Sequence, residues 1–463
     1  MTVYLHSLGC DKNLVDSELM LGLLFEAGYK AAPEAALADI IVVNTCGFIQ
    51  DAVEEGIETI LELATFKTEG RCSILIVSGC MAQRYRKEIS REIPEVDAIL
   101  GVNDFPKIVS IINSKINSKI NSKEENGLTS PLPGAEPQAL DILDDALFQK
   151  RVSTMPMHVA YVKISEGCDN RCTYCVIPEI RGAYRDRAFE SIVKECERLL
   201  NGGARELVLV AQDTARYGTK MYGRPRLHEL LEAIAGIDGL GWVRIMYVYP
   251  EHVYDELIEL IASNDKICNY LDMPVQHCDE AVISRMGRQG SRASLLDLCA
   301  SIQDMGITLR TTLIVGFPGE TEAEFKNLRS FVEEVGFDHL GVFTYSQEDG
   351  TPAADMKAQI KTEVKNARQE ELMTIQAKIA EKNGQGLVGQ RMKVMVDGSV
   401  GEDGELIAYC GRSQRDAYDL DGAVFFSSPL EWMSGDFVEL EITRAHGYDL
   451  YGKPVAELNT NER

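Results

Sequence analysis

Short apolar runs alternate with stretches of helical periodicity over the first 110 residues. The runs at 3–9, 39–45 and 73–79 are rich in β-branched side chains, and apolar positions recur at helical spacing over 16–28, 52–66 and 85–93. This alternation predicts a parallel, doubly wound α/β domain. Each run leads directly into a cysteine: Cys10, Cys46 or Cys80. Because the carboxyl ends of parallel strands meet at one edge of a sheet, the three thiols should converge.

A second alternating region extends from His158 to about Gly384. Strands are expected at 159–164, 206–211, 242–247, 270–273, 308–315 and 339–343, and helices at 191–200, 227–235, 253–262, 292–305 and 322–335. Six such units predict a partial (β/α)6 barrel, since the full barrel of this kind has eight. The chemistry of the barrel should lie at the carboxyl ends of its strands.

From about Gly386 the pattern changes to short strands separated by Gly, Asp and Ser. The expected strands are 392–396, 405–409, 422–426 and 437–442. They predict a small antiparallel β-barrel. Before the central barrel, three copies of Ile-Asn-Ser-Lys at 112–123 and a Pro/Gly-containing stretch to 138 predict a linker, followed by a short helix within 141–151. The expected domains are therefore 1–111, a linker at 112–155, 156–384 and 385–463.

Composition narrows the class of protein. The 463 residues are 45% hydrophobic and 26% charged, which predicts a soluble chain of about three domains. No apolar run approaches the roughly 20 residues of a membrane span, and the N-terminus lacks a signal-peptide pattern, so we expect a cytoplasmic protein without a membrane partner. Nothing in the sequence requires an oligomer, and a monomer is expected. The net charge of −25 opposes non-specific binding to nucleic acid and favours a basic partner, although charge taken alone is better explained by solubility.

Three further cysteines form the densest motif in the chain. Cys168, Cys172 and Cys175 follow the strand at 159–164 with C-x3-C-x2-C spacing. Three thiolates can hold three irons of a cubane and leave the fourth open, whereas a structural zinc site needs four protein ligands on one metal. An open iron can bind S-adenosylmethionine (SAM) and pass an electron into its sulfonium. The alternatives are a reduced cluster of core cysteines or a zinc loop that lacks a ligand, but no nearby cysteine or histidine completes a tetrahedron.

The cysteine spacing, with Tyr174 before the last thiol, resembles the radical-SAM superfamily. The segments 7–18, 44–49 and 79–85 resemble the N-terminal domain of the methylthiotransferases, and 411–413, 421–422 and 448–452 resemble the OB-like TRAM domain that ends those enzymes. The resemblance implies two [4Fe-4S] clusters. Cys168, Cys172 and Cys175 would hold the catalytic one, and Cys10, Cys46 and Cys80 would hold an auxiliary one whose open iron carries the sulfur to be inserted. A lone cysteine at a strand end could be a packing residue.

Other polar and flexible residues are expected at the same edge of the barrel. Gln212 and Asp213 follow the second strand, Gln276 follows the fourth, and Gly316 and Gly319 follow the fifth. With Tyr174 they are the candidates for cofactor binding, because glycines allow close backbone approach and superfamily members often bind the methionine end of SAM after the second strand. Each residue alone could equally be a loop cap or an ordinary turn. The cysteines at 72, 196, 268, 278, 299 and 410 are interpreted as structural.

Within the methylthiotransferases, the chain most resembles the enzymes that modify a ribosomal protein. Relatives that act on isopentenyl-adenosine in tRNA usually carry Gln-Met-Asn after the first cysteine and Ser-Ile-Arg after the second, where this chain has Asp11-Lys12-Asn13 and Gly47-Phe48-Ile49. The implied reaction forms 3-methylthioaspartate at the β-carbon of an aspartate in small-subunit ribosomal protein twelve. SAM would serve as radical source and methyl donor, and a sulfur donor and a reductant, neither identified by the sequence, would be needed.

The substrate class has competing hypotheses. TRAM domains usually bind RNA, but residues 386–463 contain 7 Lys+Arg and 14 Asp+Glu, a balance that favours a basic protein over phosphate. A tRNA-adenosine methylthiotransferase is the alternative. A non-catalytic iron–sulfur RNA-binding or sensor protein is a third hypothesis, and it predicts no SAM cleavage.

Overall fold

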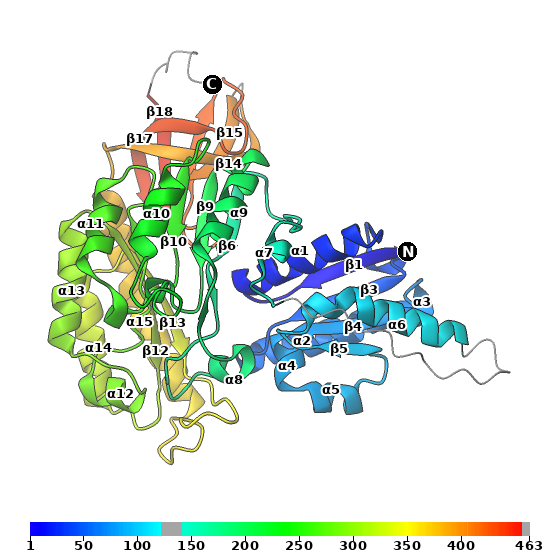
Figure 1. The fold of residues 1–463 in the computed structure, drawn as a ribbon. Coiled ribbons are helices and arrows are strands. Elements are labelled where there is room, and N and C mark those ends of the chain that lie inside the picture. The colour runs from blue at the N-terminus through cyan, green and yellow to red at the C-terminus, as the bar shows by residue number, and fades with distance from the viewer. Residues whose placement is uncertain (122–140, 405, 456–463) are drawn as a thin grey trace.

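The computed structural model describes residues 1–121, 141–404 and 406–455, arranged as an N-terminal α/β domain, a central barrel and a C-terminal β-barrel (Figure 1). The N-terminal sheet is wholly parallel, in the order β2-β1-β3-β4-β5. Its strands are β1 (Thr2–Ser7), β2 (Lys30–Ala31), β3 (Ile40–Thr45), β4 (Ile74–Gly79) and β5 (Ala98–Leu100). The predicted doubly wound domain is confirmed, and the short edge strands β2 and β5 are additions to it.

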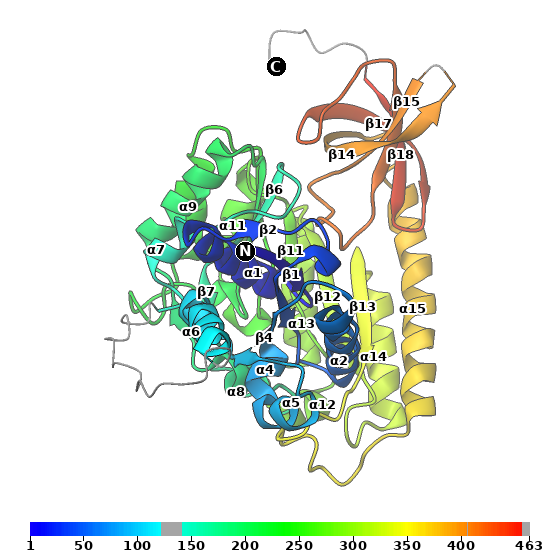
Figure 2. The same ribbon diagram turned by 90° about the vertical axis from the view of Figure 1, so that its right-hand side faces the viewer.

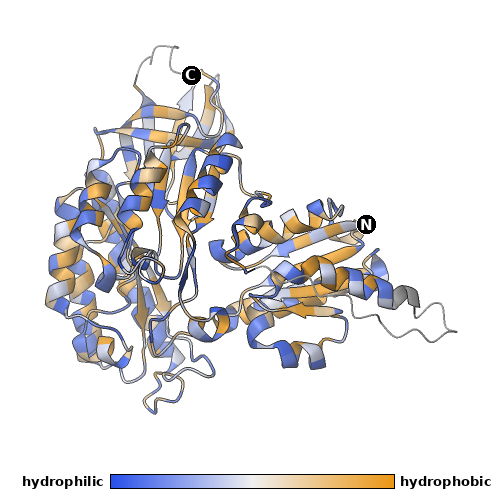
Figure 3. Cartoon of the chain, viewed as in Figure 1, coloured by the Kyte–Doolittle hydropathy of each residue, from blue (hydrophilic) through white to orange (hydrophobic). Residues whose placement is uncertain are grey.

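Helices cover both faces of this sheet. They are α1 (Asp11–Glu26), α2 (Gln50–Ala64), α3 (Phe66–Glu69), α4 (Cys80–Arg84), α5 (Arg86–Glu92) and α6 (Ile108–Asn121). Every residue of β3 and β4 is buried, and the two strands appear as apolar bands in Figure 3. Continuous β-branched sequences form these strands because a parallel sheet with helices on both faces leaves neither side in water.

The first residues of the expected linker are helical. Helix α6 continues to Asn121, through the first copies of the Ile-Asn-Ser-Lys repeat. A four-residue repeat places its isoleucines on one face of a helix, and Ile108 and Ile112 are fully buried in the same core as α1. Residues 122–140, which include the rest of that expected linker, lie outside the described part of the chain. The expected short helix is α7 (Asp145–Phe148), and Phe148 joins the same core.

The central domain contains the six expected strands in sequential order. They are β6 (Val159–Lys163), β9 (Glu206–Val210), β10 (Trp242–Ile245), β11 (Tyr270–Asp272), β12 (Thr308–Val315) and β13 (His339–Thr344), paired in parallel as β10-β9-β6 and β11-β12-β13. The helices α9 (Phe189–Asn201), α10 (Leu227–Ala235), α11 (Asp255–Ser263), α13 (Arg292–Asp304) and α14 (Glu322–Val335) match the predicted pattern. The partial barrel is thus confirmed. Shorter elements at its cysteine edge are β7 (Ser165–Glu166), α8 (Ile177–Arg181), β8 (Arg185–Asp186) and α12 (Glu280–Arg285).

The longest helix of the described chain was not expected from the sequence. α15 (Thr362–Gln385) runs along the outside of the barrel and reaches the C-terminal domain (Figure 2). Its 24 residues bury only a narrow stripe, and that stripe includes Arg368 and Gln376 as well as Leu372 and Ala380. A helix whose buried face is partly polar gives little apolar periodicity, so the pattern did not reveal it.

The C-terminal domain is a closed barrel of five strands in the order β14-β15-β16-β18-β17. Four correspond to the expected strands: β14 (Arg391–Asp403), β15 (Leu406–Arg412), β16 (Val424–Ser428) and β17 (Phe437–His446). The fifth, β18 (Asp449–Pro454), was not predicted as a strand, and it closes the barrel between β16 and β17.

This small barrel packs against the amino ends of the central strands. It contacts the first residues of four of them: Arg412 pairs with Glu206 at 2.6 Å, Phe437 meets Trp242 with ring centroids 4.9 Å apart, Asp421 accepts from the Tyr270 hydroxyl at 2.7 Å, and the Arg415 carbonyl lies 2.9 Å from His339 Nε2. The carboxyl end of the barrel lies opposite, and there the cysteine loop follows β6 and β7. The C-terminal domain therefore closes the end of the central barrel that lies away from the candidate chemistry.

The Glu206 carboxylate should contribute strongly to the stability of the contact between the C-terminal barrel and the central barrel. It is fully buried and bonded to Arg244 at 2.8 Å and Arg412 at 2.6 Å. We expect Glu206→Gln to reduce the free energy of unfolding by about 3 kcal/mol, because it leaves two buried guanidinium groups short of a counter-charge. The loss is measured as a lower midpoint temperature of the first thermal unfolding transition at neutral pH.

The same Glu→Gln change at an exposed ion pair serves as the control for burial. Glu441→Gln removes the exposed pair with Lys453, 3.3 Å long, and should cost under about 1 kcal/mol. Burial raises the pKa of Glu206, but Arg412 and Arg244 outweigh it and hold that pKa below its usual range. The stabilisation is therefore complete at neutral pH and is lost only as the pH falls below the range of ordinary carboxyl groups. Equal shifts for the two variants would contradict this account.

Candidate active site

The motif cysteines lie in the loop between β7 and α8, at the carboxyl end of β6. Cys168 and Cys172 are each 6% exposed and Cys175 is half-buried. The loop is held by backbone bonds: Cys168 N donates to Gly182 O at 3.1 Å, Cys175 N to Cys172 O at 3.1 Å, and Thr173 N to Met286 O at 2.9 Å. Cys172 Sγ also lies 2.9 Å from the hydroxyl of Tyr249, which follows β10. The three thiols thus lie close together in one loop, near enough that Cys168 and Cys172 act electrostatically on Cys175.

The N-terminal cysteines converge as the strand pattern predicts. Cys10 is the N-cap of α1, Cys46 follows β3, and Cys80 begins α4 after β4. A Cβ added to Gly9 would lie 2.8 Å from Cys46 Cβ, and one added to Gly47 would lie 2.7 Å from the Met81 backbone. The neighbours of all three cysteines are therefore in direct contact at the sheet edge, with no room for larger side chains at these two glycines.

The two cysteine groups are neighbours across the domain boundary. Cys80 packs in one hydrophobic cluster with Val102, Val176 and Ile180, and Val176 directly follows Cys175. Helix α8 therefore connects the central motif to the N-terminal thiols. Residues 158 positions apart along the chain, Cys10 and Cys168, are brought to one region by this packing.

Burial dominates the electrostatics of the thiols. It raises the pKa of Cys80 to about 12, of Cys175 to about 12 and of Cys168 to about 11, and it also raises that of Cys46. Thiolates become favourable in such sites when a positive metal centre replaces the lost hydration. Each group has three thiols that are buried or half-buried and not paired in a disulfide, a donor set that fits a cubane with one open iron.

No set of three or more His, Cys, Asp or Glu side chains in residues 1–121, 141–404 and 406–455 is arranged to hold a single metal ion. A cubane takes one thiolate on each iron and so does not need ligands gathered around one point. That the six cysteines ligate iron stays a prediction.

The other predicted residues lie on the same barrel edge. Asp213 is buried and its Oδ2 accepts from Asn170 Nδ2 at 2.9 Å and lies 2.7 Å from His252 Nδ1, while its Oδ1 has no partner within the described chain. Gln212 Nε2 donates to Glu166 Oε1 at 3.2 Å. Gln276 has a φ of +69°, and its side-chain oxygen is likewise buried without a hydrogen bond in the described structure. Unfilled acceptors facing this edge suit a ligand that donates hydrogen bonds.

The glycine turn after β12 is shaped by a buried carboxylate. Gly316 and Gly319 have φ of +72° and +77°, which strains any residue with a Cβ. Glu320 accepts from the Phe317 N–H at 3.0 Å and from Gly316, and burial raises its pKa to about 7. Tyr174 meets Phe317 edge to face, with centroids 6.4 Å apart, so the cysteine loop packs on this turn.

Sequence reasoning missed four side chains of this edge: Tyr249, His252, Glu320 and Arg181. Tyr249 and His252 stand in the loop after β10, which carries no cysteine or glycine pattern. Glu320 directly follows Gly319, but its residue type and position did not identify it as a site residue. For Tyr249, His252 and Glu320 the available signal was their position after a strand. The contacts that bring Tyr249 to Cys172, His252 to Asp213 and Arg181 to Asp16 join residues distant in sequence.

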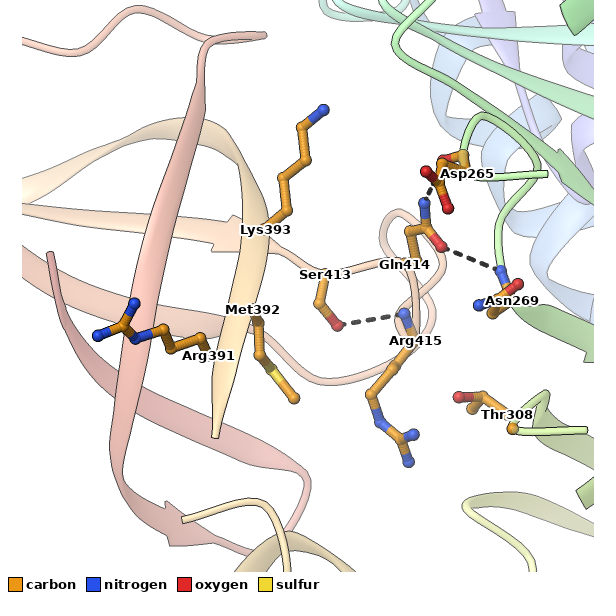
Figure 4. A pocket seen from close by; sticks show the side chains of 10 residues that line it. Asp265, Asn269, Thr308, Arg391, Met392, Lys393, Ser413, Gln414 and Arg415 are labelled. Atoms are coloured by element: carbon orange, nitrogen blue, oxygen red, sulfur yellow. Dashed lines mark hydrogen bonds between the residues drawn. The ribbon is translucent and has the colours of Figure 1, made fainter. Parts of the chain in front are cut away.

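A cavity away from this site has no matching set of functional side chains. A hollow of about 580 Å³ lies between the two barrels, lined by Asp265, Asn269, Thr308, Met392 and neighbouring residues. Its basic side chains, Arg391, Lys393 and Arg415, point away from one another (Figure 4). Arg415 is paired with Asp338 at 2.6 Å. The cysteines at 72, 196, 268, 278 and 299 lie in hydrophobic clusters, as their structural interpretation requires.

Family models match all three parts of the chain. Residues 2–101 match the uncharacterized protein family UPF0004, residues 162–332 the radical SAM superfamily, and residues 388–455 the TRAM domain. A protein of Lachnoclostridium phytofermentans named "Ribosomal protein uS12 methylthiotransferase RimO" is 46% identical over 456 residues, covering 98% of this chain and 99% of the relative. The chain belongs to the RimO methylthiotransferase family. Relatives with the same name from Geobacter sulfurreducens and Clostridioides difficile are 44% and 43% identical, and cover 97% and 99% of this chain and 98% and 100% of their own length.

Solved structures support the fold of this RimO family member. The radical SAM methyltransferase TsrM of Kitasatospora setae, with cobalamin and a [4Fe-4S] cluster bound, superimposes with a TM-score of 0.53 at 14% identity, covering 76% of this chain and 73% of that one. At that identity the likeness concerns the fold alone. Membership of the radical SAM superfamily supports an iron–sulfur cluster and SAM as cofactors of this enzyme. No helix of the described ranges combines the length and apolarity that a bilayer crossing needs.

Proposed function

We propose that this chain inserts a methylthio group at the β-carbon of an aspartate in ribosomal protein uS12, giving 3-methylthioaspartate. The observation that carries the proposal is the meeting of two three-cysteine groups through Cys80, Val176 and Ile180. Sulfur insertion at an unactivated carbon needs a hydrogen-abstracting site next to a sulfur-holding site. The full-length similarity to relatives named as uS12 methylthiotransferases supports the choice of substrate.

Each cysteine group is assigned a separate role. Cys168, Cys172 and Cys175 would hold a [4Fe-4S] cluster that binds SAM, and Cys10, Cys46 and Cys80 would hold a second that carries sulfur. When bound, these groups supply a 5'-deoxyadenosyl radical, a transferable sulfur and, from a further SAM, a methyl group. A reductant and a sulfur donor are required as separate partners.

The residues of the chain prepare this site. The cysteine loop is covered by Tyr249 and by the turn at Gly316, which keeps water from a reactive intermediate. Asp213, fixed by Asn170 and His252, presents a free carboxylate oxygen that can accept a hydrogen bond from the amino group of SAM. Gly316 and Gly319 take the positive φ that this turn requires, and a Cβ on Gly316 would clash with Lys365 Cγ.

The charge of the protein agrees with a basic protein substrate. The chain carries 47 Lys+Arg and 72 Asp+Glu, and the C-terminal residues 386–463 carry 7 and 14. An acidic surface attracts a basic ribosomal protein and repels the phosphates of tRNA. The excess of acidic over basic residues therefore makes tRNA the less favoured substrate.

Mass spectrometry tests the substrate directly. Reconstituted enzyme, SAM, sulfide and reductant are incubated without oxygen with uS12 or with bulk tRNA. We expect a methylthio group on one aspartate of uS12 and none on tRNA. A methylthio group on tRNA adenosine alone would replace the protein substrate with the nucleic acid and end the argument from charge. Reactions without SAM are the control.

A further inference from the structure

One basic side chain of the N-terminal domain reaches across to the edge of the central barrel. Lys12 lies in the first turn of α1, two residues after Cys10, and is 8% exposed. Its Nζ lies 3.4 Å from the centroid of the Tyr247 ring, which is a cation–π contact. Tyr247 follows β10 of the barrel. The ammonium group is therefore held at the boundary between the two domains, close to the N-terminal thiols.

The segment that carries Tyr247 also reaches the central cysteine loop. Tyr249, two residues further along, places its hydroxyl 2.9 Å from Cys172 Sγ. Within three residues this segment thus contacts Lys12 on one side and a thiol of the central group on the other. A carbon that loses hydrogen at the central group and gains sulfur at the N-terminal group would lie beside the same segment, within reach of Lys12.

The backbone of Tyr247 is strained to hold the ring in this place. Its φ is +61°, a region that residues with a Cβ rarely occupy. The Tyr247 N–H donates to Asp272 Oδ2 at 3.0 Å, and its carbonyl accepts from the Thr214 N–H at 3.1 Å. Asp272 and Thr214 are both buried. Strain of this kind persists where the surrounding structure enforces it, and it is concentrated at functional sites.

Lys12 keeps the capacity to bind an anion. Its Nζ lies 3.0 Å from Asp11 Oδ1, and the Tyr247 side chain also hydrogen-bonds Asp11. An ammonium group has three N–H donors, so one carboxylate and one aromatic ring leave a donor for a further partner. By comparison, Lys163 and Arg181 at the same domain boundary each contact two buried carboxylates. Lys12 is therefore less neutralised by the protein than either of them.

We propose that Lys12 is a specificity-determining residue whose ammonium group binds the carboxylate of the substrate aspartate. This inference rests on the proposed function of the site. The carboxylate of aspartate is bonded directly to the β-carbon, so it enters the domain boundary together with the reacting atom. Removing a carboxylate from water without a counter-charge is strongly disfavoured, and Lys12 supplies that charge. Asparagine has nearly the same shape but no charge, so this contact selects aspartate.

A double-mutant cycle between enzyme and substrate tests the contact. Dissociation constants are measured by anaerobic titration calorimetry with reconstituted enzyme and SAM, without reductant, so that no turnover occurs. The probe is uS12 with either aspartate or asparagine at the position that mass spectrometry identifies as modified. We expect the parent enzyme to bind the aspartate form about tenfold more tightly, and Lys12→Met to bind both forms equally. Lys12→Arg should retain part of the preference because it keeps the charge.

The chain contains a matched control in Lys393. Its Nζ also lies over an aromatic ring, 4.3 Å from the centroid of Phe437, but both residues belong to the C-terminal barrel. Lys393→Met removes one cation–π contact and one positive charge, so it changes the attraction between the acidic enzyme and a basic substrate as Lys12→Met does. It should retain the full preference for aspartate. Iron content and thermal unfolding show that each variant is loaded and folded.

Two results would overturn the role of Lys12. One is an unchanged preference for aspartate in Lys12→Met. The other is the same preference with equally weakened binding of both forms of uS12, which would assign Lys12 to the contact between the domains. Either result with uS12 that the parent enzyme modifies rejects Lys12 alone. Failure of the parent enzyme to modify uS12 would reject the proposed function, and the role of Lys12 with it.

Discussion

Cys172→Ala should abolish SAM cleavage. The thiol is 6% exposed, sits in the middle of the cysteine loop and lies 2.9 Å from the Tyr249 hydroxyl, so no other side chain can take its place. We expect formation of 5'-deoxyadenosine to fall at least about a thousandfold, equivalent to about 4 kcal/mol of transition-state stabilisation. The measurement is liquid chromatography of anaerobic reactions with dithionite. Methylthiolation of uS12 should disappear with it.

Iron content gives this variant a second readout. The N-terminal group is intact in Cys172→Ala, so about four rather than about eight irons per chain should remain after reconstitution. Cys410→Ala is the control, because Cys410 is a half-buried residue of the C-terminal barrel and should retain full SAM cleavage. Wild-type cleavage by Cys172→Ala would remove this motif from the radical step.

Cys46→Ala should separate the two activities. Cys46 contacts the segment of Gly9 and Cys10 and belongs to the N-terminal group alone. We expect substantial SAM cleavage to remain, because Cys168, Cys172 and Cys175 and the barrel edge are unchanged, while methylthiolation of uS12 falls below detection. Both products are measured in the same reaction, which makes their ratio independent of the enzyme concentration.

A different result for Cys46→Ala would revise the division of roles. Equal loss of deoxyadenosine and methylthioaspartate would mean that the N-terminal group is needed for radical formation itself. Cys72→Ala is a suitable comparison within the same domain, since Cys72 is buried in its core away from the sheet edge. It should retain both activities if the variant folds.

Much of the architecture could be predicted because it depends on local patterns. Strand–helix alternation predicted the N-terminal sheet and the six central strands, since burial on both faces demands continuous apolar strands. The sequence patterns did not predict α15 or β18. Helix α15 buries Arg368 and Gln376, and β18 is recognisable only from its pairing with β16 and β17. The repeat at 112–123 was interpreted as linker, whereas its first residues continue α6 and pack Ile112 and Ile116 on the core.

The sequence by itself determined the two cysteine groups, the order of the elements that carry them and the acidity of the surface, because spacing, periodicity and charge are properties of neighbouring residues. Only the tertiary structure decided that Cys80 packs beside Val176, that Arg181 lies between the groups, and that the small barrel covers the amino ends of the central strands. The contacts of Cys80 with Val176, of Arg181 with Asp16 and of Arg412 with Glu206 each join segments more than 90 residues apart. No local pattern encodes them, since they depend on how whole domains bury their remaining charged and apolar surface against each other.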